Sequence, residues 1–93
     1  MIDVEPPEME LRPPRLAAPP GSTDCHFHIF GPESRYPYVP VRRFTPPEVS
    51  VAQFEHVCAQ LGIERAVLVQ PSGYGFDNGR ALDAAREITL ETR

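Results

Sequence analysis

The first regular pattern along the chain is an alternation of apolar and polar side chains over residues 23–29. Because a strand points successive side chains to opposite faces, this alternation predicts a strand with one apolar and one polar face. The apolar face would carry Cys25, Phe27 and Ile29, and the polar face would carry Asp24, His26 and His28. Cys25 is therefore expected to point away from the two histidines.

Helical spacing replaces this alternation over residues 50–61, where apolar side chains recur every three or four positions. Ser50 and Gln53 form a capping-box pattern at the start, and Gly62 suits the position after the last turn. His56 falls outside the apolar stripe, so it is expected to be exposed and without function.

A second strand and a second helix complete the pattern. Residues 65–70 are nearly continuously apolar, which is typical of a parallel strand covered on both faces. Residues 78–89 predict a helix with Asp77 or Asn78 as its N-cap. The inward face of this helix would carry Leu82, Ala85 and Ile88. No third strand is predicted after it.

The order strand, helix, strand, helix predicts an α/β fold. A strand–helix–strand unit with a buried second strand belongs to a parallel sheet, and its crossover is expected to be right-handed. Between the first strand and the first helix, residues 31–47 form a long loop that contains five prolines. Its aromatic side chains are expected to form a hydrophobic plug. Arg42 and Arg43 could contact an anion, but a solvated loop face is favoured for them.

Residues 1–20 hold half of the twelve prolines, in three adjacent pairs. Proline fixes φ and lacks an N–H donor, so this segment is expected to be an extended, solvated arm. A passive arm along the domain is favoured over a Pro-rich ligand for an SH3-type groove. The sequence thus divides into the arm, residues 1–20, and one domain, residues 21–93.

Composition excludes several classes of partner. The net charge is −4, so the chain lacks the clustered positive charge that nucleic-acid binding requires. No apolar run reaches the roughly 20 residues of a transmembrane helix, and the N-terminus carries no secretory signal. Cys25 and Cys58 are expected to be reduced thiols, and the protein is expected to be cytoplasmic, with no membrane partner.

The histidines of the predicted strand are the main candidates for chemistry. His26 and His28 would leave one face roughly 6.5–7 Å apart along the strand, close enough for both rings to reach one metal ion. Asp24 on the same face could accept an imidazole N–H and fix its tautomer. The pattern alone leaves two interpretations open, a pair of ligands or a hydrated polar face without a site.

A resemblance to a known family becomes specific when the later motifs are added. The motifs are TDCHFHIFGP at residues 23–32, YPY at 36–38, FTPP at 44–47, LVQPS at 68–72 and DN at 77–78. Together they resemble the amidohydrolase-related family of metal-dependent hydrolases, in its branch near the 2-pyrone-4,6-dicarboxylate lactonases. The resemblance covers about residues 21–88.

This resemblance implies a (β/α)8 TIM barrel, of which the chain would supply about the first two βα units. It implies a hydrolase whose substrate is a small carboxylated lactone or related cyclic molecule. His26 and His28 would be catalytic and would bind a divalent, zinc-like metal, which this branch does not always require. Ser72 would contact the substrate carboxylate, although an ordinary turn hydroxyl is an equal alternative.

The sequence also departs from the family pattern. Phe44 stands where the lactonase branch tends to have a tyrosine, which puts the particular substrate in doubt. The histidines and the aspartate base of later strands are absent, so this chain alone is expected to be inactive. The alternative is a small metal-binding or interaction module that uses His26, His28 and the arm. In either case, exposed strand edges could promote self-association.

Overall fold

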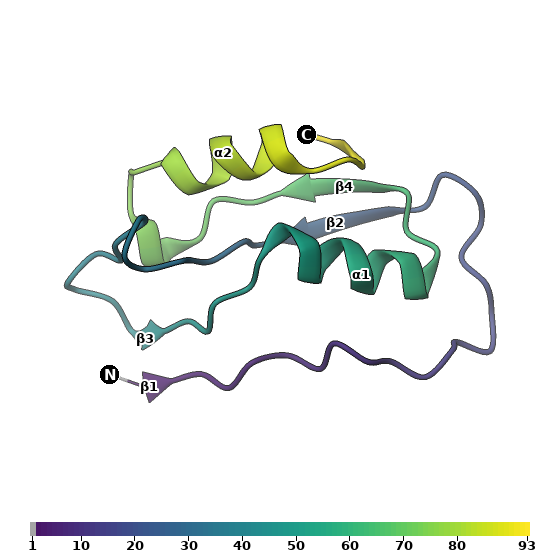
Figure 1. The fold of residues 1–93 in the computed structure, drawn as a ribbon, viewed down its shortest axis with the longest axis horizontal. Helices are drawn as coiled ribbons and strands as arrows, with labels where there is room; N and C mark the ends of the chain where they lie inside the picture. The colour runs from purple at the N-terminus through teal and green to yellow at the C-terminus, as the bar shows by residue number, and fades with distance from the viewer. Residues whose placement is uncertain (1) are drawn as a thin grey trace.

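The computed structural model describes residues 2–93 (Figure 1). In chain order the elements are β1 (Ile2–Asp3), β2 (Thr23–Phe27), β3 (Phe44–Thr45), α1 (Val51–Leu61), β4 (Arg65–Leu68), the 3₁₀ turn η1 (Ser72–Tyr74), α2 (Gly79–Glu87) and β5 (Glu91–Thr92). The predicted order of two strands and two helices is therefore present. No helix within residues 2–93 is long and apolar enough to cross a membrane.

The main sheet has the order β2-β4-β5, and both pairs of neighbours are parallel. The α/β class with a parallel sheet is thus confirmed. The expectation of no third strand is wrong, because β5 pairs with β4 through Arg93 N–H to Ala66 O (3.1 Å) and Leu68 N–H to Arg93 O (2.8 Å). These bonds are made by the backbone of Arg93, directly after the two-residue strand, so no side-chain pattern reveals them.

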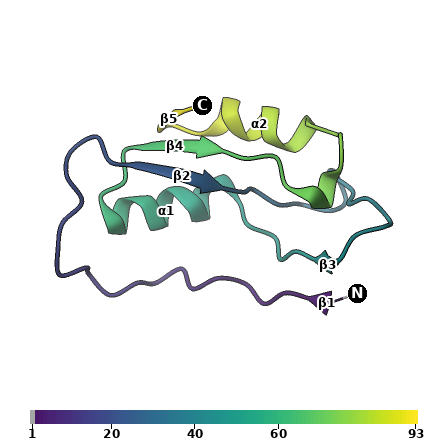
Figure 2. The ribbon, with the colours of Figure 1, turned by 180° about the vertical axis from the view of Figure 1, so that it is seen from behind.

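The hydrophobic core lies between the sheet and the two helices, α1 and α2, whose arrangement Figure 2 shows. The rings of Phe27 and Phe54 are stacked, with centroids 3.8 Å apart and planes 4° apart. Val51 and Cys58 bury the same face of α1, as its sequence spacing predicts. Burial of aromatic side chains contributes strongly to core stability, so this stack fixes how β2 lies on the helix.

A β-bulge breaks the predicted alternation along β2. Asp24 pairs with Ala66 and Phe27 pairs with Leu68, so three steps along β2 match two along β4. Paired residues of neighbouring strands share a face. Asp24 therefore lies on the helix-covered face with Ala66, and Cys25 is exposed. The prediction that Cys25 is inward and Asp24 outward is wrong, because a bulge shifts the alternation by one residue.

The inward face of α2 also differs from the prediction. Leu82 is 56% exposed and Ala85 is exposed, whereas Arg80 (5% exposed) and Ala84 are buried. Only Ile88 packs against the core as expected. The guanidinium of Arg80 lies 4.7 Å from the centre of the Tyr36 ring and pairs with Glu87 at 3.4 Å. These partners allow a charged residue to replace an apolar one on the buried face.

The predicted aromatic plug is confirmed in part, because Tyr36 and Tyr38 of the long loop join a buried cluster, whereas Phe44 lies in β3 outside it. Phe30, Tyr38 and Tyr74 form a buried cluster, and Tyr36 packs against it. Arg42 is not on a solvated face, because it is half-buried and donates to Val39 O at 2.9 Å. Arg43 is exposed, as expected.

The segment before β2 runs alongside α1 in an extended conformation (Figures 1 and 2). The Gln60 amide accepts from Leu11 N–H (2.7 Å) and donates to Met9 O (2.6 Å). His56 is exposed, as predicted, and contacts Glu10 at 2.8 Å. At its far end the segment forms β1, which pairs with β3 in parallel. It therefore reaches the loop that follows β2.

The capping box of α1 gives a test of this fold. Ser50 Oγ accepts from Gln53 N–H (3.1 Å), and Gln53 Oε1 accepts from Ser50 N–H (2.9 Å). Ser50→Ala should lower the free energy of unfolding by about 1 kcal/mol in urea denaturation. Ser34→Ala, at an exposed turn, is the control and should be neutral. If both substitutions changed the free energy of unfolding equally, the capping box would not be stabilising α1.

Candidate functional site

The rings of His26 and His28 meet at the end of β2. Their Nε2 atoms are 3.3 Å apart, and the ring centroids are 5.0 Å apart with the planes at 87°. His26 lies in the strand, and His28 follows its last residue, Phe27. The predicted strand extends to residue 29, two residues too far. The prediction that both rings project together is nevertheless confirmed.

A backbone carbonyl holds the ring of His28. The Nδ1 atom of His28 lies 2.8 Å from Val69 O, just after β4. A carbonyl oxygen only accepts hydrogen bonds, so Nδ1 carries the proton and Nε2 keeps its lone pair. His26 Nε2–H can then donate to this lone pair. Anchoring one imidazole nitrogen so that the other is available is a common arrangement for metal-binding histidines.

Asp24 does not perform the role that the sequence predicted for it. Its Oδ1 atom accepts from the backbone N–H of His26 at 3.0 Å, not from an imidazole. The bulge places Asp24 on the opposite face of the sheet, beside Ala66. Asp24 therefore stabilises the backbone of the bulge, and Val69 supplies the acceptor for the imidazole.

The spacing of the two rings fits a divalent metal. Two nitrogen ligands about 2.1 Å from one tetrahedral zinc ion lie roughly 3.4 Å apart, close to the observed 3.3 Å. Within residues 2–93 no group of three or more His, Cys, Asp or Glu side chains could hold a metal. The pair therefore offers two of the ligands that a metal site needs.

Ser72 begins η1 and its side chain is exposed. Because β2 and β4 are parallel, the segments that follow them lie at the same edge of the sheet. Ser72 and His28 thus share this edge, although no hydrogen bond among the described residues joins Ser72 to either histidine. The backbone carbonyl of Ser72 accepts from Gly75 N–H at 3.0 Å, which closes the turn.

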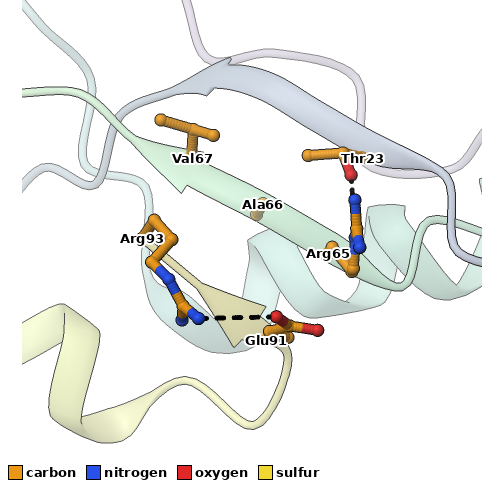
Figure 3. Close-up of a pocket in the computed structure, with 6 residues that line it drawn as sticks. All are labelled: Thr23, Arg65, Ala66, Val67, Glu91 and Arg93. Carbon is orange, nitrogen blue, oxygen red and sulfur yellow. Dashed lines mark hydrogen bonds and ion pairs between the residues drawn. The ribbon is translucent and has the colours of Figure 1, made fainter.

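A separate hollow of about 190 Å³ lies near the opposite ends of the strands. Its lining includes Thr23 and Arg65, which are hydrogen-bonded, and Arg93, which pairs with Glu91 (Figure 3). Both β2 and β4 begin at this hollow, whereas the histidines lie where β2 ends. The hollow is therefore not part of the histidine site.

Comparison with known proteins identifies the family. A family model described as amidohydrolase matches residues 23–88. The chain belongs to the amidohydrolase family. The matched stretch of this amidohydrolase chain includes both histidines and Ser72.

Relatives of the amidohydrolase chain are named as hydrolases. It is 45% identical over 78 residues to a 4-sulfomuconolactone hydrolase of Hydrogenophaga intermedia, covering 84% of this chain and 26% of that protein. It is 38% identical over 73 residues to a 2-pyrone-4,6-dicarboxylate hydrolase of Comamonas testosteroni, covering 78% and 24%. The chain therefore spans about a quarter of the length of these curated relatives.

A solved structure shows the same fold. The amidohydrolase chain matches a crystal structure of an Agrobacterium tumefaciens protein with a TM-score of 0.72 and 22% identity. The match covers 94% of this chain and 31% of that one. The likeness supports the arrangement of strands and helices described above.

Sequence reasoning missed two contributors to the site of this amidohydrolase. The Val69 carbonyl is a backbone group, so no residue type could indicate it. Tyr74 is buried beside the site, and its only sequence signal is a lone aromatic residue between two glycines. Both lie after β4, whereas the predicted ligands lie on β2.

The reactivity of the two thiols tests the β-bulge, because the bulge leaves Cys25 exposed. Burial raises the pKa of Cys58 to about 11, with the charges of Asp24 and Glu55 adding to the effect, so this thiol should not react near neutral pH. Exposed Cys25 should react with a disulfide reagent such as DTNB. We expect one reactive thiol in the folded chain and two in denaturant. Cys25→Ser should leave none in the folded chain, and an unreactive wild-type chain would contradict the bulge.

Proposed function

We propose that this chain forms the first two βα units of a (β/α)8 barrel hydrolase that acts on a small carboxylated lactone. The names of the relatives support the substrate class, because they act on 4-sulfomuconolactone and a pyrone dicarboxylate. The order β2, α1, β4, α2 with parallel strands supports the barrel, since barrels repeat this unit. We place residues 21–93 in the barrel and treat residues 1–20 as an arm outside it.

The observation that carries this proposal is the convergence of His26 and His28 at 3.3 Å. Barrel enzymes place their chemistry at the carboxyl ends of the strands, where these rings lie. His26 and His28 would hold a divalent metal through Nε2. Such a metal would polarise the lactone carbonyl and lower the pKa of a bound water toward about 7.

The residues themselves have roles that need no metal. Val69 O keeps the Nδ1 proton of His28 in place, so the tautomer of His28 is set before substrate binds. Where no metal occupies His26 Nε2, this atom could instead donate its proton in a hydrogen bond to the oxygen on which negative charge develops when the lactone carbonyl is attacked. Ser72, at the same edge of the sheet, would donate its hydroxyl to a substrate carboxylate. An ordinary turn hydroxyl remains the alternative for Ser72.

A chimera tests the histidine roles. The matched 78-residue stretch would replace its counterpart in the Hydrogenophaga intermedia enzyme. The chimera should hydrolyse 4-sulfomuconolactone, and His26→Ala or His28→Ala should lower kcat/KM at least about 100-fold. His56→Ala, on the exposed side of α1, should leave kcat/KM unchanged. The 93-residue chain alone should show no turnover. Turnover by this chain at the rate of the relative would refute the idea that its site is incomplete.

The second candidate is a small metal-binding or interaction module. It is favoured by the exposure of Leu82 on α2 and of Phe76 after β4, because exposed apolar surfaces are often contact sites. Such a module would bind metal tightly by itself, whereas half of an enzyme site would not.

A zinc titration of the 93-residue chain, followed calorimetrically, separates the two candidates. Structural zinc sites use four ligands, so a two-histidine pair should bind zinc far more weakly than they do. The weak binding should vanish in His26→Ala and in His28→Ala and persist in His56→Ala. Tight, stoichiometric binding that depends on His26 and His28 would instead favour the module.

A further inference from the structure

We propose that Tyr74 is a positioning residue that joins the loop after β2 to the loop after β4, and so fixes His28 and Ser72 relative to each other. This inference rests on the proposed function only in giving those two residues a common role. Tyr74 lies two residues after Ser72, and it contacts the segment that follows His28. Neither the sequence motifs nor the proposed chemistry uses it.

The first link is a buried hydrogen bond. The hydroxyl of Tyr74 accepts from the backbone N–H of Gly31 at 2.7 Å, and Tyr74 is 3% exposed. Gly31 has a φ of 82°, and a Cβ atom there would lie 2.7 Å from Cγ of Glu48. The backbone is therefore confined at this point. An N–H group buried without an acceptor is costly, so Tyr74 selects this loop conformation.

The second link runs through aromatic rings. The ring of Tyr74 lies 6.0 Å from that of Phe30, centre to centre, and the ring of Phe30 lies 5.8 Å from that of His28. His28 is thus placed between Phe30 and the Val69 carbonyl. A displacement of Tyr74 would remove the support behind Phe30 and leave the imidazole held by its hydrogen bond alone.

The third link holds the loop that carries Tyr74. Val39 N–H donates to Gly73 O at 2.8 Å, which joins the two loops a second time. The Gln70 side chain donates to Asp77 O at 2.9 Å and to Gly75 O at 3.3 Å. The turn containing Ser72 is therefore tied at both ends, and it can transmit the position of Tyr74 to the Ser72 hydroxyl.

The cluster offers a matched pair of substitutions. Tyr74→Phe removes only the hydroxyl and leaves Gly31 N–H without its acceptor. Tyr38→Phe removes a hydroxyl from the same cluster that lies beside the Tyr74 hydroxyl but does not bond Gly31 N–H, so the Gly31 bond keeps its acceptor. Both variants keep the rings and the apolar area. A difference between them therefore reports the Gly31 bond rather than general damage to the core.

Two readouts by NMR test the proposal on the full 93-residue chain. Tyr74→Phe should speed amide exchange at Gly31 by about tenfold, the effect of losing one hydrogen bond. It should also shift the His28 ring ¹⁵N signals away from the pattern of the Nδ1–H tautomer. Tyr38→Phe should change neither. Unchanged exchange and unchanged His28 signals in Tyr74→Phe would overturn the proposal.

A zinc titration followed by the same signals adds the link to function. Tyr74→Phe should weaken zinc binding by at least about tenfold, as loss of groups that orient metal-binding histidines generally does. If the wild-type chain bound no zinc while the two NMR effects of Tyr74→Phe appeared, the metal role would fail and the positioning role would stand.

If Tyr74→Phe fails to fold, Phe30→Leu tests the ring contact. Phe30→Leu should shift the His28 ring ¹⁵N signals and leave amide exchange at Gly31 unchanged. Unchanged His28 signals would overturn the proposal.

Discussion

The stack of Phe27 on Phe54 is the contact on which the candidate site depends. It fixes Phe27 on the helix-covered face of β2, between the two histidines. Because neighbours of a buried residue point the opposite way along a strand, His26 and His28 are directed to the uncovered face. The chemistry at the end of the strand is thus a consequence of packing behind it. This apolar contact does not involve the histidines, so it can order the end of β2 without any ligand at the site.

The parts of the fold that repeat a simple period could be predicted from the sequence. Helix α1 agrees with its apolar stripe and its capping box almost residue for residue. The predictions fail where a bulge interrupts the alternation of a strand, or where a side chain from another segment stabilises the burial of a polar residue. A bulge displaces Asp24 to the far face, and no propensity marks it. On α2, the Tyr36 ring from a distant loop accommodates Arg80, so the helix buries a face that hydrophobicity does not indicate.

The candidate site likewise has a part that the sequence predicts and a part that it does not. The pairing of two imidazoles follows from their spacing on a strand, so a sequence can predict it. The groups that hold these rings come from the neighbouring strand and its loop, and their positions exist only after β2 and β4 have paired. Every residue has a backbone carbonyl, so the residue type does not indicate that Val69 O is an acceptor. In parallel sheets, ligands can therefore be predicted more readily than the atoms that orient them.

The path of the first twenty residues has a practical consequence. Although Gly21 leads into β2 at the beginning of the sheet, the chain before it crosses α1 and returns to the opposite end, where Ile2 pairs with Phe44. The start of the chain therefore lies toward the end of the molecule at which β2 terminates, on the side where α1 covers the sheet. An affinity tag or fluorescent protein fused ahead of Ile2 would project from the end of the molecule that carries β3 and the loop after β2. A fusion intended to leave that end free needs another attachment point.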